Sequence, residues 1–70
     1  SSADELSEKI SQTITDLLDD HQPLEIAATL VTQGLAIYKT ILSRPDYESM
    51  VDTISESRDQ IYTFDPPNIQ

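Results

Sequence analysis

Residues 23–42 read PLEIAATLVTQGLAIYKTIL and decide the fold. Pro23 suits the first position of a helix, where its missing N–H would have had no partner. Apolar residues make up most of the segment that follows: Leu24, Ile26, Ala27, Ala28, Leu30, Val31, Leu35, Ala36, Ile37, Tyr38, Ile41 and Leu42. They cover well over half of its surface, so we expect a helix over 23–42 that is buried on more than one side.

A first helix is expected before this segment, over about 3–20. Ser2 and Glu5 have the Ser-x-x-Glu spacing of a capping box, which predicts a helix start near Ala3. A single apolar stripe with helical spacing follows, formed by Leu6, Ile10, Ile14, Leu17 and Leu18.

A third helix is expected over about 45–63. Pro45 pushes Arg44 out of the helical region and opens a new first turn. A near-heptad stripe follows, interrupted at Ser57 and Arg58: Tyr47, Met50, Val51, Ile54, Ile61, Tyr62 and Phe64. Residues 65–70 contain two consecutive prolines and are expected to form an extended tail.

The fold class is therefore all-α, with a single helical domain over 1–64. Short connections favour a helical hairpin or a small bundle of three helices. Whether the first helix packs on its own chain or is exchanged with a neighbour stays open. With 70 residues and no cysteine, the chain is short for an independent core and has no disulfides, so we expect oligomerisation to complete it.

The net charge of −9 limits the classes of partner. It argues against direct binding of nucleic acid, which requires clustered basic residues, and against anionic membranes. No apolar run is long enough to cross a bilayer and no signal peptide is recognisable, so we expect a soluble, cytoplasmic protein. The acids lie on both flanks, whereas residues 23–43 carry only Glu25 and Lys39 as charged side chains.

The central helix is the expected interface with a second copy, most simply in a homodimer. Glycine in a helix interior costs about 1 kcal/mol of stability relative to alanine. We therefore expect a compensating interaction at Gly34, such as the close approach of another helix. The alternative is a tolerated surface glycine. The expected interface comprises Ala27, Leu30, Val31, Gly34, Leu35, Ile37, Tyr38 and Ile41.

Two smaller sites are conceivable. Lys39, Arg44 and Tyr47, with Tyr38 nearby, gather around the second turn and form a candidate anion site at a helix N-terminus. Glu48, Asp52 and Glu56 form a row spaced about 6 Å apart, comparable to successive DNA phosphates, and a candidate mimic of DNA. The first set can also be interpreted as interface residues, and the second as a solvated helix face.

No catalytic motif is recognisable, so we expect no enzyme activity and no cofactor. His21 lies beside Asp16, Asp19 and Asp20, but four such residues at a fraying helix end seldom hold a metal, and a solvated loop is the expected structure.

The stretches 35–43, 47–52 and 57–61 resemble small uncharacterised proteins encoded by T4-like phages of marine cyanobacteria. The resemblance covers about the last two thirds of the chain and rests on the character of two helices. It implies a phage accessory protein acting in the host cytoplasm, and it carries over no activity or functional residue. It also favours a function in which the protein antagonises a host factor, including by sequestering a signalling nucleotide.

The leading expectation is a small acidic helical protein-interaction module, homo-oligomeric, with a phage accessory or regulatory role and with a host protein as a candidate partner. Two alternatives remain open: an oligomer that sequesters a small ligand such as a nucleotide, and a DNA-mimic inhibitor.

Overall fold

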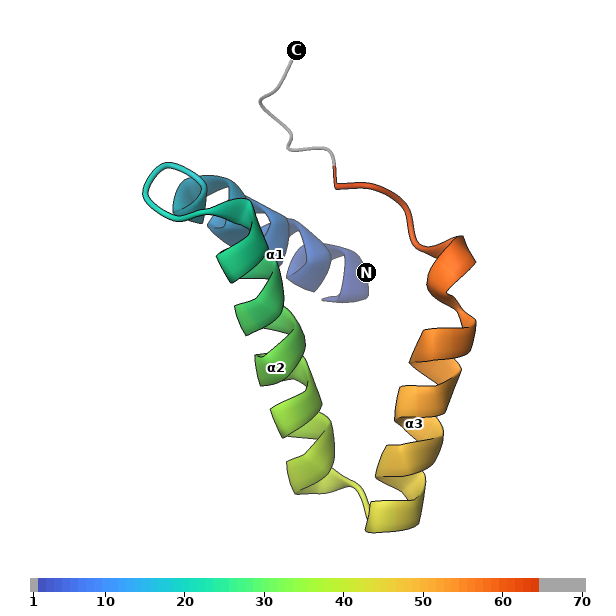
Figure 1. Ribbon diagram of the computed structural model, residues 1–70. Coiled ribbons are helices and arrows are strands. Elements are labelled where there is room, and N and C mark those ends of the chain that lie inside the picture. Colours follow the sequence, from blue (N-terminus) through green and yellow to red (C-terminus); the bar gives the residue numbers. More distant parts are fainter. Residues whose placement is uncertain (1, 65–70) are drawn as a thin grey trace. The chain divides into compact units, whose positions relative to one another are not determined.

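The computed structural model describes residues 2–64, and the tail expected over 65–70 lies outside them. Three α-helices follow one another: α1 (Ser2–Leu17), α2 (Pro23–Ile41) and α3 (Arg44–Glu56), and a short 3₁₀ helix, η1 (Arg58–Gln60), comes after them (Figure 1). No strand occurs in this part of the chain. The all-α fold class with three helices is confirmed.

The chain divides into two compact units. One contains α1 and the start of α2 as far as Ala28, and the other comprises Thr29–Thr63. In the second unit α2 and α3 are joined through Leu42 and Ser43 as a helical hairpin (Figure 1). The single domain expected over 1–64 stays a prediction.

Helix α1 ends at Leu17, three residues before the expected end. Its last turn tightens, since the Asp19 N–H bonds to the Asp16 carbonyl at 3.2 Å and the Asp20 N–H to the Leu17 carbonyl at 3.1 Å. Consecutive acids oppose the negative C-terminal end of the helix dipole, which favours an early end at this point.

Helix α2 begins at Pro23 as predicted. The Gln22 carbonyl accepts the first helical hydrogen bond, from the Ile26 N–H at 3.0 Å. Pro23 thus occupies a position where its missing N–H costs nothing. The expectation that this helix is buried on more than one side is not met within the chain, because Ile26 is the one buried residue among those the structure describes, with 7% of its surface exposed.

Helix α3 begins one residue before Pro45, because Ser43 and not Arg44 takes the extended backbone conformation. The Ser43 hydroxyl accepts a hydrogen bond from the Asp46 N–H at 3.3 Å, as an N-cap residue does. The connection between α2 and α3 is therefore only Leu42 and Ser43.

The expected end of α3 at Thr63 was wrong, because the helix stops at Glu56. The Arg58 side chain folds back and donates from Nε to the Ser55 carbonyl at 2.8 Å and from Nη2 to Ser55 Oγ at 3.0 Å. The Ser57 hydroxyl also bonds back to the Thr53 carbonyl at 2.9 Å. The interruption of the apolar stripe at Ser57 and Arg58 thus marks the end of the helix, since these polar groups satisfy its last carbonyls.

Candidate functional site

The apolar surface of α2 separates into two neighbouring stripes in the Thr29–Thr63 unit. The first comprises Val31, Leu35, Tyr38 and Leu42, spaced by four, three and four residues. Leu35, Tyr38 and Leu42 are half-buried, as are three residues on one face of α3: Tyr47, Met50 and Val51. We interpret these two faces as the inner side of the hairpin.

The second stripe, which we call the Gly34 stripe, comprises Leu30, Gly34, Ile37 and Ile41. It has the same spacing but is offset by one residue, so it lies beside the inner stripe on the helix surface. Ile37 is 62% exposed and Ile41 is 68% exposed. A heptad spacing of this kind is the pattern by which two helices pack along a seam.

Seven of the eight expected interface residues are divided between the two stripes, and Ala27 lies outside both. Gly34, Leu35 and Tyr38 are half-buried, whereas the other five are exposed: Ala27, Leu30, Val31, Ile37 and Ile41. Sequence reasoning placed all eight on one interface, because the two stripes are adjacent and their spacings are the same.

Gly34 has room for a side chain within its own chain. A Cβ atom built at this position meets no atom within 4 Å apart from its sequence neighbours and the backbone of its own helix. The close approach expected at Gly34 is therefore not made by this chain, and approach by a second chain stays a prediction.

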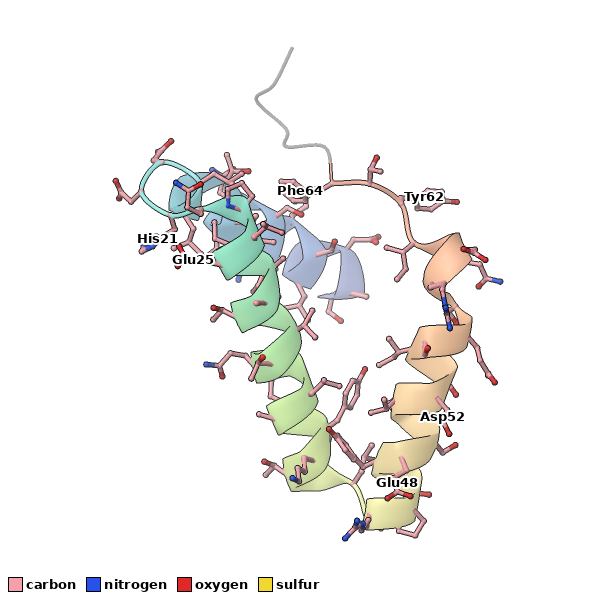
Figure 2. All side chains as sticks on the ribbon, viewed as in Figure 1. His21, Glu25, Glu48, Asp52, Tyr62 and Phe64 are labelled. Atoms are coloured by element: carbon pink, nitrogen blue, oxygen red, sulfur yellow. The ribbon has the colours of Figure 1, made fainter. Side chains whose placement is uncertain are left out.

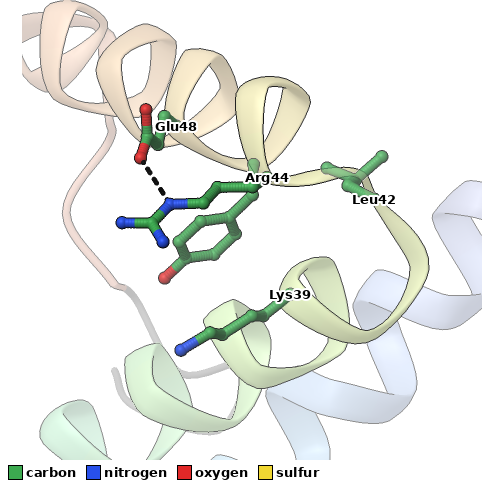
Figure 3. A pocket seen from close by; sticks show the side chains of 5 residues that line it. Lys39, Leu42, Arg44 and Glu48 are labelled. Carbon is green, nitrogen blue, oxygen red and sulfur yellow. Dashed lines mark hydrogen bonds and ion pairs between the residues drawn. The ribbon is translucent and has the colours of Figure 1, made fainter.

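The candidate anion site is partly assembled. A pocket of about 340 Å³ is lined by Lys39, Leu42, Arg44, Tyr47 and Glu48 (Figure 3). It brings together the three residues expected for this site, whereas Tyr38 does not line it. A volume of this size is at the lower end of the range of small-molecule sites.

Glu48 changes the electrostatics of this pocket. Its carboxylate accepts a hydrogen bond from Arg44 Nε at 3.2 Å, and both side chains are exposed (Figure 3). Sequence reasoning missed this contact, although Glu48 follows Arg44 by four residues, the spacing at which opposite charges pair on a helix. The carboxylate neutralises part of the positive charge that an anion would need.

The acidic row on α3 is exposed at Glu48, Asp52 and Glu56. Figure 2 shows Asp52 on the side of α3 that is turned away from α2. Glu48 pairs with Arg44, so the first charge of the row is already engaged. A DNA-mimic face over these residues stays a prediction.

The cluster at the end of α1 is solvated. Asp16, Asp19, Asp20 and His21 are all exposed, and Asp16 accepts a hydrogen bond from Gln12 Nε2 at 3.3 Å. Within residues 2–64, no group of three or more such side chains has an arrangement that could hold a metal ion. In the same residues, none of the helices has the length and apolarity needed to cross a bilayer.

Comparison with other proteins identifies no relative. No family model matches the sequence, and neither a curated protein nor a solved structure is significantly similar to it. The resemblance to phage proteins therefore stays a prediction.

Proposed function

We propose that this chain is a small acidic interaction module that works as a homodimer, with a regulatory or accessory role exerted by binding another protein. The observation that carries the proposal is the lack of buried apolar residues: of the described residues, only Ile26 is buried. Small domains that cannot complete a core compensate with disulfides, metals or oligomerisation, and this chain has no cysteine.

The acidic flanks suit the binding of a basic partner by the dimer. A net charge of −9 per chain is doubled on association, and a large charge of one sign accelerates encounter with an oppositely charged surface. A host protein with a basic surface is the partner class that this charge favours. Its association rate should fall steeply between low and physiological salt.

Light scattering behind gel filtration tests the assembly directly. We expect a mass of twice 7.8 kDa that persists over roughly a hundredfold dilution. A mass of 7.8 kDa at every concentration would refute the dimer, and the apolar surface would then have to serve a different protein.

A second candidate function is sequestration of a small anion such as a cyclic nucleotide. It is favoured by the pocket, because Lys39, Arg44 and Tyr47 all line it. Calorimetry with a panel of cyclic nucleotides tests it. Glu48→Gln should tighten binding because it removes the competing carboxylate, whereas Arg44→Gln should weaken it; absence of heat across the panel for both the wild type and Glu48→Gln would reject the site.

A further inference from the structure

We propose that the dimer forms through the Gly34 stripe, with α2 of a second copy crossing α2 at Gly34 on a two-fold axis. This inference rests on the proposed homodimer and names its seam. In a two-fold interface the residue at the axis faces its own counterpart, so Gly34 would face Gly34 of the second copy. The apolar residues on either side of it would then pack across the seam: Leu30, Ile37 and Ile41.

Charge favours a second copy as the occupant of this stripe. Residues 26–38 contain no charged side chain, whereas both flanks of the chain are acidic. A second copy carries the same acids, so it can approach without placing like charges opposite each other only along this neutral segment. A basic partner would instead be drawn to the acidic surfaces of α1 and α3.

Gly34 has no function within its own chain that would require glycine. Its φ is not positive, so its backbone conformation is open to any residue. Apart from its two neighbours in sequence and the backbone of its own helix, no atom of the chain lies within 4 Å of the position of a Cβ. Glycine weakens a helix interior relative to alanine, and close approach of another backbone is the remaining structural reason to retain it.

The two α2 helices are expected to run antiparallel. This arrangement sets opposite helix dipoles side by side and keeps Lys39 of one copy away from Lys39 of the other. It also places Ile41 of each copy opposite Ala27 of the other, because these two residues lie seven positions on either side of Gly34. A large side chain thus meets a small one at both ends of the seam.

Three variants of the full chain test the seam, with the dimer dissociation constant measured by sedimentation equilibrium. Ile37→Asn removes an apolar group from the centre of the stripe. Ile61→Asn is the matched control, because Ile61 has nearly the same exposure, 67% against 62%, and lies outside α2. Gly34→Ala adds one methyl group that the chain itself accommodates.

We expect Ile37→Asn to raise the dissociation constant at least about thirtyfold, as loss of a central interface anchor does, and Ile61→Asn to leave it within about threefold. Gly34→Ala should raise it about tenfold or more while circular dichroism shows equal or higher helix content, since alanine favours the helix. That combination excludes misfolding as the cause of the weaker association.

The outcomes separate this inference from the proposed function. A dimer that Ile37→Asn and Ile61→Asn weaken equally, or that Gly34→Ala leaves unchanged or tightens, would overturn the Gly34 seam and leave the homodimer standing. A wild-type chain that is monomeric at every concentration would overturn both.

Discussion

Truncation of Ile26 tests whether the start of α2 contributes to a core within the chain. Ile26 lies in the first turn of α2, in the same unit as α1, and only 7% of its surface is exposed. Leu24 lies two residues earlier and is 86% exposed. Ile26→Ala and Leu24→Ala remove the same number of carbon atoms from one helical turn, so they form a matched pair that differs in burial.

The difference between the two variants follows from the buried area. Each substitution removes three carbon groups, and burial of one such group contributes about 0.8 kcal/mol. Weighted by burial, Ile26→Ala should lower the free energy of unfolding by about 2 kcal/mol, with a further cost if a cavity remains. Leu24→Ala should lower it by only about 0.3 kcal/mol.

Thermal unfolding followed by circular dichroism measures both losses. For a domain of this size, 2 kcal/mol corresponds to a decrease in Tm of about 8–16 °C. All variants must be compared at one protein concentration, because association makes the Tm of a dimer concentration-dependent. Equal decreases for Ile26→Ala and Leu24→Ala would refute the assignment of Ile26 to a core.

Three further predictions concern the helix ends and the seam. Ser43→Ala should lower the free energy of unfolding by about 1 kcal/mol, measured by thermal unfolding, because it removes the N-cap of α3. Ser49→Ala, in the exposed middle of the same helix, should leave stability unchanged, and equal losses for the two variants would argue against the cap. Arg58→Ala should speed amide hydrogen exchange in the last turn of α3 while changing the global free energy of unfolding by less than about 0.5 kcal/mol. Unaltered exchange would show that the hydrogen bonds of the Arg58 side chain do not stabilise the helix end. The chain has no cysteine, so a mixture of Ala27→Cys and Ile41→Cys chains should form a mixed disulfide under oxidation. Ile41→Cys alone should form no disulfide, because antiparallel packing separates the two Ile41 positions by about 21 Å. The reverse result would indicate a parallel seam.

The helices themselves followed from the sequence, because their signals are local. Pro23 set the start of α2, and helical spacing of apolar residues located all three elements. The end of α3 was misplaced because it depends on hydrogen bonds from the Arg58 side chain to Ser55. From the sequence alone, Arg58 could have continued the helix as a surface residue, and these hydrogen bonds became apparent only in three dimensions.

The candidate sites were only partly accessible from the sequence. Lys39, Arg44 and Tyr47 were expected together because the turn between α2 and α3 is short, and the pocket contains all three. The sequence alone also determined that α2 is apolar on more than one side, since composition and spacing suffice for that. Only the tertiary structure decided that Leu35 and Tyr38 are half-buried whereas Ile37 and Ile41 stay exposed, because that depends on the side from which α3 folds back after Ser43.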